Sequence, residues 1–166
     1  MTIDISKSLV YDDGFPRVPN IMYRMYPLLD DFTVETTGFY GYLLTWRQNK
    51  RDHVMYGKAW LNLDEMEAQT GISKYKIRKH TEVLIRYGLL RVTKSRRIPN
   101  KKIYEVLDPI TEAEFRLSYS ETIDRFGEKL LEIERGLEAD RIRLAEIKGA
   151  TSKPIGNDEN GEAIYF

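Results

Sequence analysis

The chain of 166 residues has room for one compact domain and an appended segment, and it contains no cysteine, so disulfides, thiolate metal sites and cysteine nucleophiles are excluded. Its formal net charge is +0, which by itself argues against a nucleic-acid-binding protein. The distribution of charge along the chain reverses this interpretation. Residues 36–107 carry 15 basic and 6 acidic side chains, whereas residues 1–35 and 108–166 are both acidic. A basic middle segment is typical of a module that neutralises phosphates.

Residues 1–14 are polar and irregular, and we expect them to form a flexible N-terminal arm. The beginning of this arm has neither a basic start nor an apolar run, so it does not resemble a signal peptide. No stretch of the chain approaches the roughly 20 apolar residues that a membrane helix needs. We therefore expect a soluble, cytoplasmic protein with no membrane partner.

Residues 15–109 have the pattern of one small domain. The two prolines of Phe15-Pro-Arg-Val-Pro19 favour an extended lead-in, which is followed by a short helix over about residues 20–29. Apolar side chains at helical spacing predict a second helix over residues 36–49. A short strand is expected over residues 58–61.

Two N-cap residues predict the next two helices. Asn62, with Glu65 three residues later, has the signature of a capping box and predicts a helix over residues 63–69. Ser73 predicts the start of another helix, which covers about residues 74–87. A glycine follows the end of each of these helices, as is usual where a helix stops. Small and apolar side chains recur every three or four residues on one side of the second helix, at Ile77, Thr81, Leu84 and Gly88.

A β-hairpin is expected next. Residues 89–94 alternate apolar and polar side chains, which predicts a strand with one solvated face, and a second strand is expected over residues 103–107. Residues 95–102 hold four basic side chains around a Pro99-Asn100 turn. Two short helices followed by a hairpin with a basic tip is the order of a winged helix-turn-helix domain. We therefore expect a mainly α fold with a small β-wing (α+β), continued by a long C-terminal helix.

The second of these helices and the hairpin tip have the chemistry of a DNA-contacting surface. A helix in the major groove needs donors for base edges and phosphates on its outer side, and arginine at a hairpin tip suits a narrow minor groove. The competing interpretation is a surface helix and a turn with ordinary solvated charges. The residues that we expect to contact double-stranded DNA are Ser73, Lys74, Tyr75, Lys76, Arg78, Lys79, Arg96, Arg97, Lys101 and Lys102.

No other kind of site is indicated. His53 and His80 have no partner at metal-ligand spacing, so both are interpreted as ordinary polar residues, and we expect no metal and no cofactor. No Gly-rich phosphate loop is present and no histidine pair accompanies any tyrosine, so we expect no catalytic residues and no enzymatic activity. Trp46 and Trp60 are interpreted as core aromatics.

Residues 110–148 form a separate acidic segment without proline, in which a helix is expected over residues 111–148. Its apolar side chains form a heptad seam that predicts a homodimer through this helix, and Asp140 is the one polar interruption. Gly127 and Gly136, which weaken a helix, favour the alternative that the stripe folds back on the protein's own core. The seam consists of Tyr119, Ile123, Phe126, Leu130, Ile133, Leu137, Leu144 and Ile147.

The last residues, 149–166, are small, polar and acidic. We expect this tail to be disordered, because it has too few apolar side chains to bury. A disordered tail next to an oligomerising helix is a candidate binding segment for a protein partner.

Residues 15–107 resemble the N-terminal winged-helix domain of RepA_N-type replication initiators from Gram-positive plasmids, and more distantly the DnaD-like replisome organisers of phages. The resemblance rests on Phe15-Pro-Arg-Val-Pro19, on Tyr40-Gly-Tyr-Leu-Leu44, and on Pro99-Asn100 followed by Ile103-Tyr-Glu-Val106. It implies a DNA-binding domain of a replication protein. The run from Gly71 to Leu90 is also similar, without a gap, to the turn and recognition helix of bacterial winged-helix proteins.

Two functions remain open at this point. The resemblance implies a role in plasmid or phage DNA replication initiation or its control. The initiators carry a second folded helical domain, however, which the acidic C-terminal segment does not resemble, and this favours a transcriptional regulator that represses a mobile element. A third alternative is a winged helix that binds proteins instead of DNA. Both DNA-binding roles require the same groove chemistry, so the sequence separates them poorly.

Overall fold

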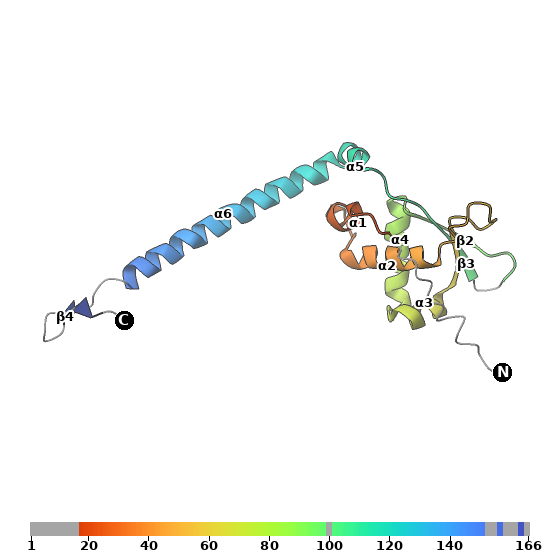
Figure 1. Cartoon of the computed structure of the whole chain (residues 1–166), viewed down its shortest axis with the longest axis horizontal. Helices are drawn as coiled ribbons and strands as arrows, with labels where there is room; N and C mark the ends of the chain where they lie inside the picture. The colour runs from red at the N-terminus through yellow and green to blue at the C-terminus, as the bar shows by residue number, and fades with distance from the viewer. Residues whose placement is uncertain (1–16, 99–100, 152–155, 158–162, 165–166) are drawn as a thin grey trace. The chain divides into compact units, whose positions relative to one another are not determined.

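A computed structural model of the chain describes residues 17–98, 101–151, 156–157 and 163–164. Its contacts divide the protein into two units, Met1–Phe115 and Arg116–Phe166, which are treated separately below (Figure 1). The arm expected over residues 1–14 and the turn expected at Pro99-Asn100 lie outside the described residues.

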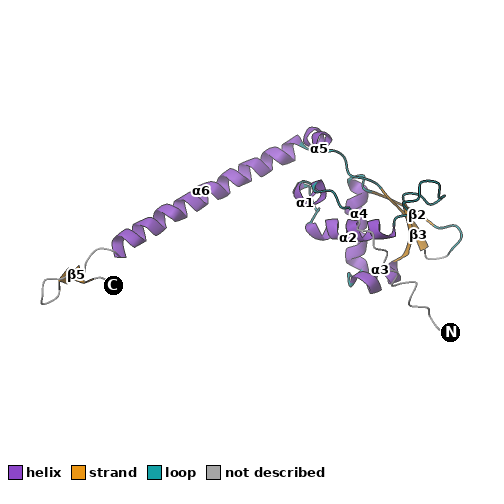
Figure 2. Ribbon diagram, in the orientation of Figure 1, coloured by secondary structure: helices purple, strands orange, loops and turns teal. Residues whose placement is uncertain are grey.

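The first unit is a mixed α+β fold, in agreement with the expected class (Figure 2). Its strands form one antiparallel sheet in the order β1-β3-β2. The described elements, in chain order, are α1 (Ile21–Arg24), the 3-10 helix η2 (Tyr26–Leu28), α2 (Val34–Trp46), β1 (Lys58–Asn62), α3 (Leu63–Thr70), α4 (Lys74–Arg86), β2 (Leu90–Lys94), β3 (Lys101–Val106) and α5 (Glu112–Ser118).

The first two helical segments differ from the expected boundaries. The helix expected over residues 20–29 is divided into α1 and η2, because Pro27 has no N–H group for a continued α-helical ladder. Helix α2 begins at Val34 instead of residue 36. Its start is stabilised by a capping box in which Oγ1 of Thr33 accepts from the backbone N–H of Thr36, and Oγ1 of Thr36 accepts from the N–H of Thr33, both at 3.3 Å.

The capping box expected at Asn62 and Glu65 is only half correct. Asn62 does cap α3, since its Oδ1 accepts from the backbone N–H of Asp64 at 2.8 Å. The carboxylate of Glu65 instead pairs with Nζ of Lys101 on the neighbouring strand β3, at 3.4 Å. The fold thus places β3 next to α3, and Glu65 pairs with a lysine of this strand instead of accepting from the backbone N–H of Asn62.

The sheet brings Lys101 and Lys102 into β3, although the sequence predicted both for the hairpin tip. Strand β1 pairs with β3 from Lys58↔Glu105 to Asn62↔Lys101, and β2 pairs with β3 from Leu90↔Val106 to Lys94↔Lys102. Residues 102–105 of β3 are paired with strands on both sides, and Lys101 is paired with Asn62 of β1, so both lysines belong to the ladder. The tip is consequently shorter than expected.

Helix α4 packs against α2, α3 and β2, and the core lies between these helices and one face of the sheet (Figure 1). Tyr40 ties α2 to the end of the sheet, because its hydroxyl donates to the carbonyl of Leu107 at 2.8 Å. The largest buried side chains include Met22, Tyr26, Phe39, Tyr40, Leu43, Met66, Ile77, Leu84, Leu89, Leu90 and Phe115.

The two tryptophans do not lie in the core, contrary to expectation. Trp46 is 40% exposed at the end of α2, and Trp60 is 38% exposed on β1. Ala59 and Leu61 on either side of Trp60 are buried. Because successive side chains of a strand point to opposite faces, burial of these two neighbours directs Trp60 to the outer face of the sheet.

The second unit consists mainly of one helix. The segment expected as a single helix over residues 111–148 forms two, α5 and α6 (Ser120–Thr151), separated at Tyr119. Part of the tail expected to be disordered continues α6 or forms the paired strands β4 (Gly156–Asn157) and β5 (Ala163–Ile164), and the rest lies outside the described residues. No helix in the described part of the chain is both long and apolar enough to span a membrane.

Candidate nucleic-acid interface

The turn between α3 and α4 is set by local chemistry. Gly71 ends α3 with a φ of 68°, in the left-handed region that favours glycine. Ser73 caps α4, since its Oγ accepts from the backbone N–H of Lys76 at 3.4 Å, as the sequence predicted. Oε1 of Glu67 accepts from the N–H of Lys74 at 3.1 Å, so a carboxylate of α3 already occupies the N-terminus of α4.

This geometry assigns Ser73 a structural role in addition to its expected place at the DNA surface. We predict that Ser73→Ala lowers the free energy of unfolding by about 1 kcal/mol, because one N–H at the start of α4 loses its acceptor. Ser73→Asp should retain most of the stability, since aspartate is an equally good N-cap. Urea titration followed by circular dichroism measures both values. Equal stability of Ser73→Ala and the wild type would contradict the capping role.

The two sides of α4 differ as the sequence predicted. Ile77 and Leu84 are fully buried and dock the helix on the core. Tyr75, Arg78 and Lys79 are exposed on the opposite side. Within the described residues, neither Arg78 nor Lys79 forms an ion pair with a carboxylate. The centre of the outer side of α4 thus presents two cations and a tyrosine to solvent.

The cations at the two edges of this side are neutralised by the protein itself. Nζ of Lys74 pairs with the carboxylate of Asp64 and lies 3.7 Å from Oε2 of Glu67. The hydrogen bond to Asp64 raises the pKa of Lys74 above its ordinary value. At the other edge, Nζ of Lys76 lies 3.1 Å from Oε1 of Glu35 on α2. A phosphate would have to compete with these carboxylates for either lysine.

The hairpin tip is ordered by Ser95, a residue that the sequence analysis did not single out. Its Oγ accepts from the backbone N–H groups of Arg97 and Ile98, at 3.3 and 3.2 Å. Such side-chain-to-backbone bonds two and three residues apart are characteristic of serine in turns. Arg96 and Arg97 are both exposed, and neither forms an ion pair within the described residues.

Strand register adds Lys94 to the candidate site. It lies directly opposite Lys102, and Lys102 in turn lies opposite Leu61, which is buried. These two lysines therefore lie on the same face of the sheet as the core, at the end of the strands next to the hairpin tip. Like charges directly opposite each other destabilise an antiparallel pair, by roughly 0.2–1 kcal/mol, and a bound polyanion would relieve this repulsion. The alternation along β2 could have indicated Lys94 from the sequence.

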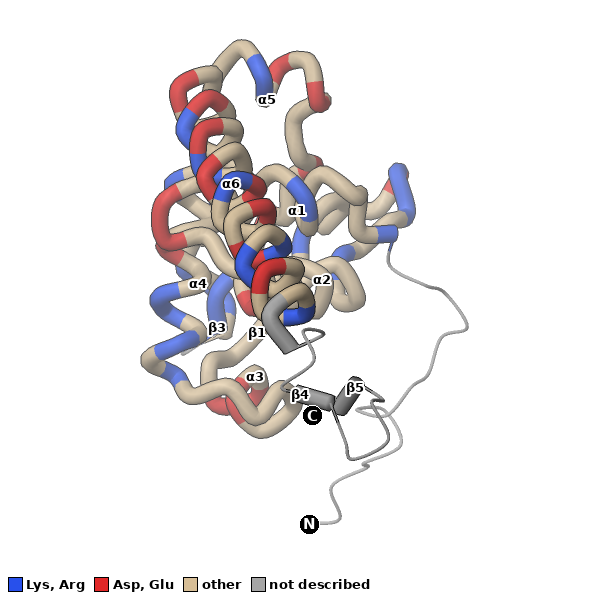
Figure 3. The backbone as a smooth tube through the Cα atoms, turned by 90° about the vertical axis from the view of Figure 1, so that its left-hand side faces the viewer, with Lys and Arg blue, Asp and Glu red and all other residues tan. Residues whose placement is uncertain are grey.

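The eight cations among the expected residues thus fall into two groups. In the described structure, the cations without a carboxylate partner are Arg78, Lys79, Arg96, Arg97 and Lys102, to which the register adds Lys94. The cations held by carboxylates are Lys74, Lys76 and Lys101. In Figure 3, basic positions gather around α4 and β3, whereas acidic and basic positions alternate along α6.

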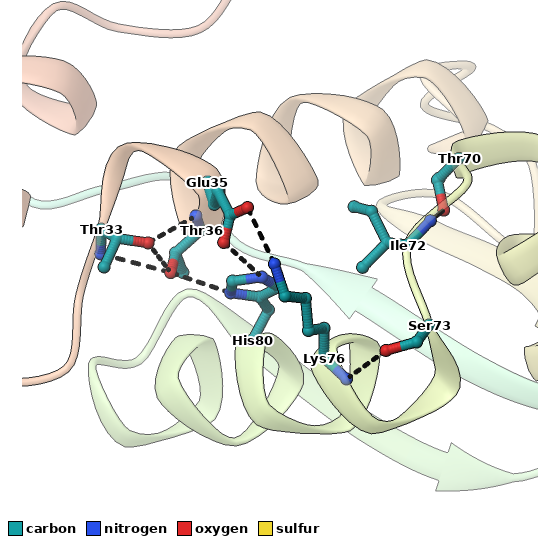
Figure 4. Close-up of polar contacts among 8 residues, drawn as sticks. All are labelled: Thr33, Glu35, Thr36, Thr70, Ile72, Ser73, Lys76 and His80. Atoms are coloured by element: carbon teal, nitrogen blue, oxygen red, sulfur yellow. Dashed lines mark hydrogen bonds and ion pairs between the residues drawn. The ribbon is translucent and has the colours of Figure 1, made fainter.

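His80, which the sequence indicated only as an ordinary polar residue, is buried. Only 6% of it is exposed, and its ring packs 5.9 Å from that of Phe39. Its Nδ1 lies 3.0 Å from Oγ1 of Thr36 (Figure 4). Burial lowers the pKa of His80 below its ordinary value of 6.5, which keeps the imidazole neutral at neutral pH.

Comparisons of the chain with protein families, curated proteins and solved structures found no match. Within the described residues, no cluster of three or more His, Cys, Asp or Glu side chains is arranged to hold a metal ion. The chemistry of the exposed cations is therefore the principal guide to function.

Proposed function

We propose that this protein binds double-stranded DNA through a winged helix-turn-helix domain. The observation that supports this most directly is the group of exposed cations without carboxylate partners on the outer side of α4 and on the hairpin. Exposed charges of one sign repel each other, so their concentration has an energetic cost that a phosphate backbone removes. We propose a binding role in the cytoplasm without enzymatic activity.

The order of elements supports the winged-helix assignment. Helices α3 and α4 form the helix-turn-helix, α4 is the recognition helix, and the β2–β3 hairpin is the wing. Tyr75, Arg78 and Lys79 would enter the major groove with α4, where arginine can donate two hydrogen bonds to a guanine. Arg96 and Arg97 would contact phosphates or a narrow minor groove.

Within this class we propose a role in plasmid or phage DNA replication initiation or its control, on the strength of the resemblance of residues 15–107. The alternative is a repressor of a mobile element. It is favoured by the second unit, whose described part consists mainly of the helix α6. Footprinting on the native replicon separates the two, because an initiator protects repeated sites within the origin and a repressor protects a promoter.

We also propose that a second copy of the chain binds to the seam of α6. Six seam residues from Phe126 to Ile147 are between 39% and 58% exposed, although all are large and apolar. Lys129 and Glu134 occupy the positions that flank the seam and can pair between parallel helices. A dimer would present two recognition helices to half-sites about 34–36 Å apart, one turn of DNA. The tail over residues 149–166 remains a candidate segment for a further protein partner.

The function is tested by the affinity of the full-length protein for duplex DNA as a function of salt. We predict that replacing both Arg96 and Arg97 with alanine weakens binding to all sequences. The slope of log K against log salt should fall in magnitude by about 1–2, because up to two phosphate contacts no longer release counterions.

The matched control replaces Arg125 and Arg135 with alanine, which removes the same charge from α6 at positions off the seam. This control should retain the wild-type slope. Equal affinities and parallel slopes for the Arg96/Arg97 variant and the wild type would show that the hairpin does not touch DNA. A wild-type protein without salt-dependent affinity for any duplex would overturn the proposed function.

A further inference from the structure

A buried polar cluster connects α4 to the first turn of α2 (Figure 4). Nδ1 of His80 lies 3.0 Å from Oγ1 of Thr36, which is fully buried. Nε2 of His80 is also buried, has no hydrogen-bond partner among the described residues, and lies 3.8 Å from Oε2 of Glu35. The other oxygen of the same carboxylate accepts from Nζ of Lys76 at 3.1 Å. One carboxylate thus faces both a lysine and a histidine of α4.

The hydrogen bonds of Thr36 indicate where the imidazole proton lies. Oγ1 of Thr36 accepts from the N–H of Thr33, and its own hydrogen can be donated to Nδ1 of a neutral His80. The imidazole hydrogen is then on Nε2 and points toward the carboxylate of Glu35. The other tautomer would place the lone pair of Nε2 next to a negative charge, which is repulsive.

The same cluster can accommodate a protonated imidazole. In that state Nδ1 of His80 would donate to Oγ1 of Thr36, and the hydroxyl hydrogen of Thr36 would turn to Oγ1 of Thr33, 3.2 Å away. No heavy atom has to move between the two states. The cost of protonation is therefore electrostatic, and it depends on the charges around the ring.

These charges come from both helices. Burial is the largest influence and lowers the pKa of His80; Glu35 on α2 raises it, and Lys76 and Lys79 on α4 lower it. In the protein without DNA, Lys76 neutralises Glu35 and repels a second proton on the ring. Lys76 therefore adds to the effect of burial in favouring the neutral imidazole.

We propose that DNA binding transfers Lys76 from Glu35 to a phosphate, and that His80 then takes up one proton from solvent and pairs with Glu35. The proposal rests on the DNA-binding function proposed above. Lys76 is suited to this exchange because its side chain is 54% exposed, at the edge of the outer side of α4. The exchange removes a cation from the ring, leaves Glu35 without its lysine and adds a negative phosphate nearby. All three changes favour the charged imidazole.

The sign of the pH dependence follows from linkage. The pKa of His80 is below 6.5 in the protein without DNA and is higher in the complex, so the complex binds more protons. The affinity for DNA is independent of pH above both pKa values of His80. It rises as the pH falls through the pKa of His80 in the complex, and it levels off below the pKa of His80 in the free protein. One proton per protomer limits the rise to about tenfold per pH unit.

The test uses the full-length protein and a fluorescent mixed-sequence duplex of about 30 base pairs at constant salt. Dissociation constants are measured between about pH 8 and about pH 5.5. The proton uptake that accompanies DNA binding is measured by calorimetry in two buffers of different ionisation enthalpy. We expect the wild type to bind about three- to tenfold more tightly per protomer at the acidic end, with net proton uptake. His53→Gln, which changes the exposed histidine, should retain this dependence.

Two variants test whether His80 and Glu35 are the groups that cause the pH dependence. His80→Gln should bind without pH dependence. Glu35→Gln should bind more tightly than the wild type at about pH 8, because Lys76 is no longer held by a charge, and should also lose the pH dependence. Glu35 is exposed, so this variant is decisive even if His80→Gln does not fold.

If either variant keeps the wild-type dependence of affinity on pH, or if the wild type binds DNA independently of pH, then DNA binding is not linked to protonation of His80. Either result would leave the DNA-binding function intact. Failure of the wild type to bind the duplex at any pH would instead overturn the proposed function.

Discussion

Arg78→Ala is expected to weaken binding to the specific site by about 1–3 kcal/mol, roughly 5- to 150-fold, and to relax discrimination at one base pair. Arg78 is exposed in the second turn of α4 and forms no ion pair within the described residues, so its guanidinium is available for a guanine. Affinities for the protected site and for a panel of its single-base variants measure both effects.

The matched control is Arg91→Ala. This variant makes the same substitution at another exposed arginine. Arg91 differs from Arg78 because it lies on the outer face of the sheet, where it pairs with Glu105 at 3.6 Å. Arg91→Ala should change DNA affinity by less than about twofold, because its charge is already paired with Glu105 and its ion pair contributes little to the stability of the fold. If Arg78→Ala keeps the wild-type sequence preference and loses only affinity, Arg78 contacts a phosphate and does not read a base.

Leu137→Asp is expected to convert a dimer into a monomer and to weaken binding to a pair of half-sites by about 10²- to 10⁴-fold, because the second recognition helix then no longer binds at a high effective concentration. A charge in the middle of the seam would have to be buried between two helices without a partner. Sedimentation equilibrium and binding to the paired site measure the two effects.

Leu131→Asp is the control on the same helix. Leu131 and Leu137 are each 54% exposed, but Leu131 lies one position off the seam. This variant should remain dimeric and bind as the wild type does. A wild-type protein that sediments as a monomer at micromolar concentration, or a dimeric Leu137→Asp variant, would exclude the seam as the dimer interface.

The elements around the candidate site were predictable because their signals are local. Ser73 and Gly71 act on backbone groups within a few residues, so the turn between α3 and α4 follows from short-range chemistry. The spacing of Ile77 and Leu84 likewise determines which side of α4 is buried. For the same reason, the exposed position of Arg78 and Lys79 could be predicted correctly.

The neutralisation of individual cations was decided by the tertiary structure. Lys76 is paired with Glu35, 41 residues away in sequence, and Lys101 with Glu65 on another element. Burial of His80 requires α2, and exposure of Trp60 results from the orientation of β1. Electrostatic and packing energies depend on distance in space, and sequence patterns report only distance along the chain. Thus the sequence determined which residues form α4 and the hairpin, whereas the fold determined which of their charges are available to a ligand.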